Sequence, residues 1–190
     1  MGFGRRIAAA AMGAALLAGH ATGALAQPPY YAMPDDWRRQ EEAPYGFSVE
    51  LPVAPDREED RSAPPSLNLA YRDRNGEIAI LAVDLGAAIS LGEAKESALL
   101  NGMMEEFAAE QRARLVETRP VTLEHGRAVE ATYRALSDDN IMMKARAILA
   151  GRYVYVISST GFAGNMPLTY DRVLASFRPV APPPPAPGSR

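Results

Sequence analysis

The sequence predicts an α+β fold in which an antiparallel β-sheet is sandwiched by helices. Three observations carry this prediction. Short segments with apolar residues at every second position recur between turn residues, which is typical of half-buried strands. A stretch near residue 100 repeats apolar residues at spacings of three and four, which indicates a helix lying on a sheet. A second helical stretch follows the last strand, so the expected order is one strand, a hairpin, a helix, four strands and a helix.

The first 26 residues have the features of a secretory signal. Arg5 and Arg6 form a positive start, an apolar stretch follows over residues 7–17, and Ala24-Leu25-Ala26 is a small-x-small cleavage site. We therefore predict cleavage between Ala26 and Gln27 and a periplasmic or secreted protein. The apolar stretch is well short of the ~20 residues that cross a bilayer, so we expect no transmembrane span.

Composition limits the classes of function. Cleavage would leave about 164 residues, enough for one domain with its own core, and would change the formal net charge from −3 to −5 by removing two arginines. The sequence has no basic run to bind phosphate backbones, so nucleic acid is not an expected partner. The absence of cysteine excludes thiolate metal sites and thiol chemistry. We expect a monomer without cofactors.

The chain divides into a signal peptide (1–26), a flexible N-terminal segment (27–44), one domain (45–179) and a Pro-rich disordered tail (180–190). Residues 56–65 also lack helical or strand periodicity. The domain is expected to start with a strand at Tyr45 to Pro52. A hairpin follows, with strands Leu67 to Tyr71 and Ile78 to Leu85 around an Asn75-Gly76 turn, which would set Tyr71 opposite Ile80.

The rest of the domain is predicted as a helix, four strands and a short helix. Ser90 and Glu93 form a capping box at the start of the first helix, which faces the sheet with Leu100, Met103, Met104 and Phe107. The strands are predicted at Leu115 to Leu123, Arg127 to Leu136, Ile141 to Leu149 and Arg152 to Thr160. Pro120 cannot donate to a ladder, so it indicates an edge position or a bulge. The last helix is predicted to begin near Asn165 and to face inward with Leu168, Val173, Leu174 and Phe177.

The candidate binding site is one face of the predicted sheet. A two-residue turn at Ala150-Gly151 would place Arg146 opposite Tyr155, in reach of a cation–π contact. One sheet face is then apolar and suited to receive a helix. The other carries Glu130, Thr132, Arg134, Lys144, Arg146, Tyr153 and Tyr155. Arginine and tyrosine are residue types that carry interface energy, so this face is a candidate site for a partner or small ligand. The alternative is a half-exposed face that the last helix partly covers.

No catalytic or metal site is predicted. His125 is the only histidine after the signal and lies in a turn, and the chain has no G-x-S-x-G motif. A hydrolase-like enzyme that uses the Ser158–Thr160 region is the alternative from another class. A third interpretation is a structural envelope component tethered by the Pro-rich tail.

The order of elements resembles a known fold family. The segments "GFSVELP", "GRYVYVISST" and "VLASFRP" and the elements between Tyr45 and Pro179 are similar to the PsbP/Mog/DcrB-like fold. The resemblance implies a sheet sandwiched by helices and a binding or assembly role rather than catalysis, and it carries over no site residue. We therefore predict a non-enzymatic periplasmic module that recognises a protein or small ligand in the cell envelope.

Overall fold

The computed structural model describes residues 37–52, 55–73, 76–87, 91–124, 126–163 and 169–180. The predicted signal peptide, residues 27–36, the tail from residue 181 and the residues Ser90, His125, Asn165, Pro167 and Leu168 lie outside the described residues. In chain order the elements are β1 (Trp37–Glu42), the 3-10 helix η1 (Ala43–Tyr45), β2 (Phe47–Pro52), β3 (Asp56–Asp60), β4 (Ser66–Asp73), β5 (Gly76–Asp84), α2 (Glu93–Glu110), β6 (Ala113–Leu123), β7 (Gly126–Ala135), β8 (Ile141–Ala150), β9 (Tyr153–Phe162), α3 (Thr169–Ser176) and β10 (Arg178–Pro179).

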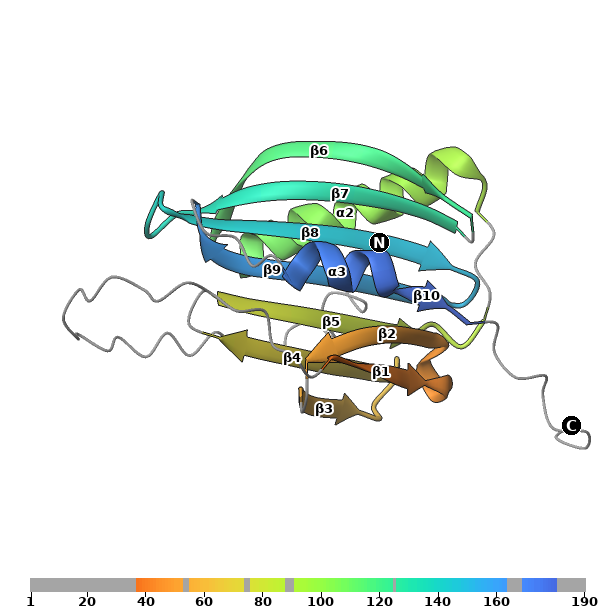
Figure 1. The fold of residues 1–190 in the computed structure, drawn as a ribbon. Helices are drawn as coiled ribbons and strands as arrows, with labels where there is room; N and C mark the ends of the chain where they lie inside the picture. The colour runs from red at the N-terminus through yellow and green to blue at the C-terminus, as the bar shows by residue number, and fades with distance from the viewer. Residues whose placement is uncertain are drawn as a thin grey trace, which may run out of the picture.

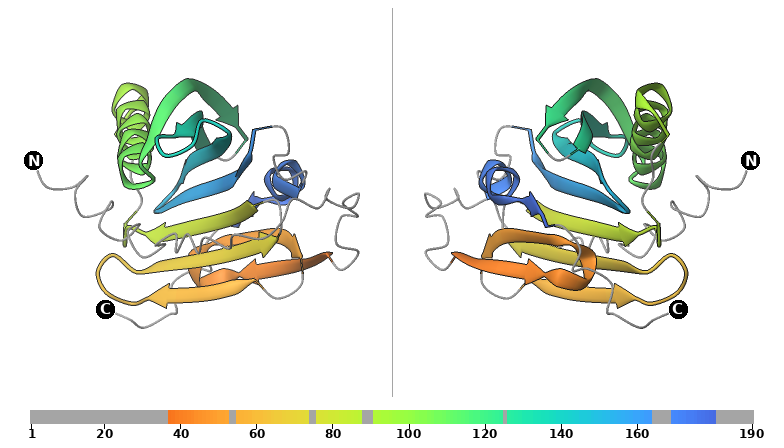
Figure 2. Two further views of the ribbon diagram at one scale, coloured as in Figure 1. Left: turned by 90° about the vertical axis from the view of Figure 1, so that its left-hand side faces the viewer. Right: turned by 90° about the vertical axis from the view of Figure 1, so that its right-hand side faces the viewer.

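The described strands form two antiparallel sheets (Figure 1). The large sheet has the order β3-β4-β5-β9-β8-β7-β6, and the small sheet has the order β1-β2-β10. Helix α2 lies on one face of the large sheet, and the small sheet and α3 lie on the other (Figure 2). This arrangement confirms the predicted α+β class and the helices on both faces of the sheet.

The face under α2 is the predicted apolar face. Leu100 and Met104 are each 1% exposed and pack on small residues of the sheet, which include Ala145 and Ala147. Small side chains let the helix approach closely, and the phenol of Tyr133 donates a hydrogen bond to the Met104 carbonyl at 3.1 Å. Because this hydroxyl is buried, the bond removes the cost of an unpaired polar group.

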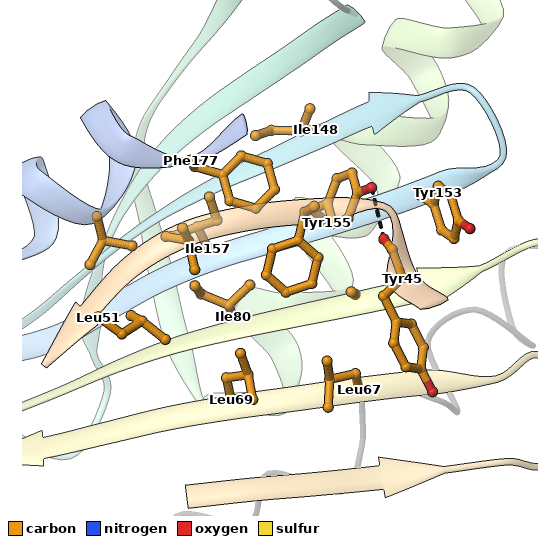
Figure 3. Close-up of a cluster of buried hydrophobic side chains, with 14 of the residues drawn as sticks. Tyr45, Leu51, Leu67, Leu69, Ile80, Ile148, Tyr153, Tyr155, Ile157 and Phe177 are labelled. Carbon is orange, nitrogen blue, oxygen red and sulfur yellow. Dashed lines mark hydrogen bonds between the residues drawn. The ribbon is translucent and has the colours of Figure 1, made fainter. Parts of the chain in front are cut away.

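The opposite face of the large sheet is covered at its centre by β2 and α3. Phe47 of β2, Phe177 after α3 and Tyr155 of β9 form an aromatic cluster with ring centroids 5.1–5.6 Å apart. Leucine and isoleucine side chains of β4, β5 and β9 surround it (Figure 3). The small sheet is therefore a cover for the core, and its strands come from both ends of the described chain.

The four strands predicted after α2 are confirmed to within two residues at each end. β6, which contains Pro120, is the edge strand of the large sheet, and its register with β7 shifts between Leu115 and Glu117. Both outcomes predicted from Pro120, an edge position and a bulge, thus occur in this strand. The bulge lies four residues before the proline rather than at it.

Two strands occur where the sequence predicts none. Trp37–Glu42, expected in a flexible segment, pairs along its whole length with β2. Asp56–Asp60, expected without regular structure, pairs with β4 although all five residues are exposed. Both are edge strands that gain backbone hydrogen bonds on one side only. Their side chains need not alternate between apolar and polar, so periodicity carries no signal for them.

In two predicted hairpins the turn is displaced by one residue, so the predicted cross-strand pairs are wrong. Tyr71 pairs with Ile78 rather than Ile80, and Tyr155 pairs with Ile148 rather than Arg146. Gly76 is therefore part of β5, where an added Cβ would lie 1.7 Å from the Thr160 carbonyl oxygen. Gly76 therefore allows the close approach of β9 and does not form the turn. Each shift moves a partner by two residues, so the predicted assignment of side chains to sheet faces is unchanged.

The first helix begins later than predicted, and the predicted start of the last helix lies outside the described residues. Gly92, with a φ of 77° and no side-chain cap, precedes α2 in place of the predicted Ser90 cap. Leu100, Met103, Met104 and Phe107 face the sheet as expected. α3 begins at Thr169, and Val173 and Phe177 are buried as predicted, with Leu174 partly buried beside them.

Candidate functional site

The structure divides the candidate sheet face into a covered half and an open half. Tyr153 and Tyr155 are 2% and 0% exposed and belong to the core under β2. The Tyr155 hydroxyl donates to the carbonyls of Gly46 at 2.8 Å and Tyr45 at 3.0 Å. Burial, with the neighbouring charges of Tyr153 and Asp84, raises the pKa of Tyr155 well above its usual value. The prediction that these tyrosines contact a partner is therefore wrong, because a strand more than a hundred residues away in sequence covers them.

The predicted cation–π contact between Arg146 and Tyr155 is also absent. Arg146 pairs across the strands with Ile157, as the register shift requires. Tyr153 instead lies under the guanidinium of Arg152, whose central carbon is 5.0 Å from the ring centroid. Arg146 instead makes its side-chain contact with β7.

The other five predicted residues lie together on the open half. They are Glu130, Thr132 and Arg134 of β7 and Lys144 and Arg146 of β8, and we call them the polar patch. Register pairs Glu130 with Arg146 and Thr132 with Lys144, and each of the five side chains is half-buried. On this face of the sheet, β6 borders the patch on one side and α3 on the other (Figure 1).

Glu130 holds two arginines from opposite sides. Arg146 Nε donates to one carboxylate oxygen at 2.8 Å, and Arg119 Nε of β6 donates to the other at 2.6 Å. Burial alone would raise the pKa of Glu130. The hydrogen bonds and charges of Arg146 and Arg119 outweigh it and hold this pKa below its usual range. The carboxylate therefore stays ionised at neutral pH and fixes both guanidinium groups.

A substitution of Glu130 should lower stability in a pH-dependent way. A carboxyl whose pKa is lowered by folding stabilises the folded state above its unfolded pKa and loses this effect as the pH falls through the folded pKa. We expect Glu130→Gln to reduce the free energy of unfolding by about 1–3 kcal/mol at pH 7, in line with the loss of hydrogen bonds between charged groups. Urea unfolding between pH 7 and pH 3 would show the difference from the original protein shrinking below about pH 4.

Glu58→Gln is the matched control for this measurement. Glu58 lies on the exposed edge strand β3, so its substitution should change stability little at any pH. A difference for Glu130→Gln that stays constant down to pH 3 would contradict the role of its charge.

Lys144 and Arg134 hold their charges without a carboxylate partner among the described residues. Arg134 donates to the backbone carbonyl of Asp139 at 3.1 Å. No hydrogen bond or ion pair joins the Lys144 side chain to any part of the chain that the structure describes. These two cations of the polar patch are thus the ones left for an external group.

Sequence reasoning missed two residues at this site. Arg119 of β6 pairs directly with Glu130 in a register that runs unbroken from Leu123 opposite Gly126, and the bulge between Leu115 and Glu117 lies beyond it. Tyr170 of α3 contacts Ile157, the cross-strand partner of Arg146, so it lies near the patch, and burial raises its pKa. Its hydroxyl donates to the Ile157 carbonyl at 3.4 Å and fixes α3 on β9. The helical stripe predicted for α3 did not include it.

The Ser158–Thr160 region lacks the arrangement of a serine nucleophile. Ser159 is 1% exposed, and its Oγ has no hydrogen-bond partner among the described residues. Arg127, two residues after His125 in the sequence, pairs with Leu149 of β8. Leu149 in turn pairs with Val154 of β9. Ser159 is five residues further along β9, which is about 17 Å at 3.3 Å per residue. Arg127 and the start of β7 are therefore at the other end of the strands from these hydroxyls.

A surface hollow of about 540 Å³ lies outside the predicted site. Its wall combines the start of α2 with the turns that follow β6 and β8. Arg127 occupies it and pairs with Glu93 at 2.9 Å and with Glu96 at 3.2 Å. These charges are already paired with one another, and the hollow shares no residue with the polar patch.

The described part of the chain lacks two further features. It holds no cluster of three or more histidine, cysteine, aspartate or glutamate residues that could bind a metal ion. None of its helices is both long and apolar enough to cross a membrane.

The fold places the chain among α+β proteins with a PsbP-like architecture, as the resemblance in sequence implies. The solution structure of cyanobacterial PsbP (CyanoP) from Synechocystis sp. PCC 6803 is similar to it, with a TM-score of 0.54 and 13% identity. The match covers 82% of this chain and 99% of that chain. At this identity the similarity establishes the fold and no shared activity.

The other comparisons do not assign the chain to a family. A crystal structure from Bacteroides thetaiotaomicron VPI-5482 matches with a TM-score of 0.36 and 18% identity, over 72% of this chain and 46% of that chain. No protein-family model matches the sequence, and no curated protein does. Function is therefore argued from the residues of this chain.

Proposed function

We propose that this chain is an exported, non-enzymatic binding or assembly module that recognises a protein partner in the cell envelope through its polar patch. One observation carries the proposal. Lys144 and Arg134 are half-buried cations without a carboxylate partner among the described residues, on a sheet face that is otherwise closed by β2 and α3. Arginine is a residue type that carries interface energy, and the ammonium of Lys144 beside it can likewise pair with an external group.

The arrangement of the polar patch favours binding over chemistry. Glu130 and Arg146 form an ion pair between strands, and the lowered pKa of Glu130 keeps its carboxylate ionised at neutral pH. Rigid, pre-oriented charges reduce the entropy that an interface loses on association. The predicted signal peptide supports the location in the envelope, and the PsbP-like fold is compatible with an assembly role.

The third interpretation, tethering by the Pro-rich tail, depends on residues beyond those described. The polar patch belongs to the folded domain, so the proposed binding does not require residues 181–190. A truncated protein that ends at Val180 should therefore keep its partner.

Affinity capture from an envelope extract tests the proposed function when it compares matched variants. We expect the original protein to enrich a specific partner and Arg134→Ala/Lys144→Ala to lose it. The control is Arg61→Ala/Lys95→Ala, which removes the same charges from exposed positions outside the polar patch. Circular dichroism would verify that both variants are folded.

Two outcomes would contradict the proposal. Equal capture by all three proteins would show that the polar patch is not the binding surface. Equal loss from both double variants would show that total charge, rather than this face, drives the capture.

A further inference from the structure

We infer that the polar patch binds carboxylate side chains of an acidic protein segment, with Lys144 as the central contact. The inference rests on the proposed function, because it names the chemistry of the partner for the same surface. It starts from the distribution of charge over this face of the sheet.

The open half of the sheet is basic in an acidic protein. Strand alternation and register place five cations on this face of β6, β7 and β8, against two carboxylates. The cations are Arg114, Arg119, Arg134, Lys144 and Arg146, and the carboxylates are Glu117 and Glu130. Asp139 lies nearby, 4.0 Å from Arg114. The whole chain has a formal net charge of −3, so this local excess of positive charge is not a general property of its surface.

The excess is concentrated at Lys144. Glu130 already accepts hydrogen bonds from Arg119 and Arg146, which neutralises part of their charge. Lys144 has no such partner within the described chain, and its neighbour across β7 is Thr132, a half-buried hydroxyl. An ammonium beside a hydroxyl donor is suited to an oxyanion such as a carboxylate, because each can donate a hydrogen bond to it.

The shape of the patch favours a protein segment over a membrane. The side chains of Glu130 and Arg146 are only 15% and 19% exposed, whereas Arg119 at the edge is 68% exposed. The central ion pair is thus shielded by its neighbours, and a projecting aspartate or glutamate side chain reaches such groups more readily than a flat layer of lipid headgroups. Glu117 and Glu130 also interrupt the row of cations that a phosphate backbone would need.

The sequence provides a direct probe, since its two lysines are Lys95 and Lys144. Reductive methylation with ¹³C-formaldehyde labels both amines and preserves their charge. NMR titration with a deca-glutamate peptide should shift the Lys144 signal in a saturable way and leave Lys95, on the exposed face of α2, unchanged. Because the contact is electrostatic, about 0.5 M NaCl should abolish the shift. Equal shifts at both lysines, or none at Lys144, would overturn the inference.

Two substitutions test the direction of the effect. Arg134→Gln should weaken peptide binding several-fold. Glu130→Gln should strengthen it several-fold, because it releases Arg119 and Arg146 from their internal counter-ion. A purely structural role for Glu130 predicts no such gain. Unchanged binding by a folded Arg134→Gln protein would count against the inference, and this variant is informative even if Glu130→Gln does not fold.

Failure of this inference can be told apart from failure of the proposed function. If phosphatidylglycerol vesicles shift Lys144 and the peptide does not, the acidic protein segment is wrong and a lipid is the ligand. If the peptide has no effect while envelope capture still requires Arg134 and Lys144, the partner is not acidic but the patch still binds it. If capture is independent of both residues, the proposed function itself fails.

Discussion

Tyr155→Ala should lower the free energy of unfolding by about 3–5 kcal/mol, the range for removal of a buried aromatic side chain. Tyr155 is fully buried between the large sheet and β2, and its ring contacts Phe47 and Phe177 at centroid distances of 5.6 and 5.1 Å. The substitution removes the centre of this aromatic cluster and leaves a cavity. Chemical denaturation followed by circular dichroism measures the change.

Tyr155→Phe separates packing from hydrogen bonding at the same position. It keeps the ring but removes the hydroxyl that donates to the Tyr45 carbonyl, whereas the Gly46 carbonyl still accepts the Val180 N–H at 2.8 Å, so we expect a smaller loss of about 1–3 kcal/mol. A loss below about 1 kcal/mol for Tyr155→Ala would contradict its place in the core. It would restore the interpretation that Tyr155 belongs to an exposed binding face.

Leu100→Ala should have an effect of similar size on the other side of the sheet. Leu100 is 1% exposed and lies under α2, where it packs on the alanine-rich strands β7 and β8. The exchange should cost about 2–5 kcal/mol, because small alanines on the sheet cannot move to fill the space left by the leucine. Thermal and urea unfolding would both report it.

Leu91→Ala is the matched control for Leu100→Ala. Leu91 precedes α2 and is 46% exposed, so its truncation should change the free energy of unfolding by less than about 0.5 kcal/mol. Similar losses for both leucines would contradict the packing of α2 against the sheet.

The sequence was sufficient for the fold class and for the central strands. Alternation is strong over most of β7 and β8, where one side of the strand faces α2, whereas β9 begins with a continuous apolar run that is buried on both faces. The edge strands β1 and β3 escaped prediction, since β3 is charged along its length and is held by backbone pairing with β4. A residue pattern reports burial, and a strand that is not buried leaves little pattern.

Register was the least predictable feature, and its consequence for the site was small. Turn chemistry at Asn75-Gly76 and Ala150-Gly151 indicated two-residue turns one step away from the observed pairing. Face assignment survived because side chains repeat every second residue along a strand. The five residues of the polar patch were therefore grouped correctly, whereas the partner of Arg146 on β9 was not.

Burial of the tyrosines could not be read from the strands that carry them. Tyr153 and Tyr155 share a face with Arg146, and only the docking of β2 and α3 separates the covered half from the open half. The cover comes from distant parts of the chain: Tyr155 bonds to the Gly46 carbonyl 109 residues away. A sequence pattern gives the residues of a face, but not which part of that face another element covers.

Amine acetylation measured by mass spectrometry tests most directly the claim that the polar patch is the binding surface. The acetylation rates of Lys144 and Lys95 can be compared in buffer with carrier albumin and in envelope extract. We expect the extract to slow modification of Lys144 several-fold and to leave Lys95, on the exposed face of α2, unaffected. Equal rates for Lys144 in the two media, in an extract from which the protein captures its partner, would contradict the claim.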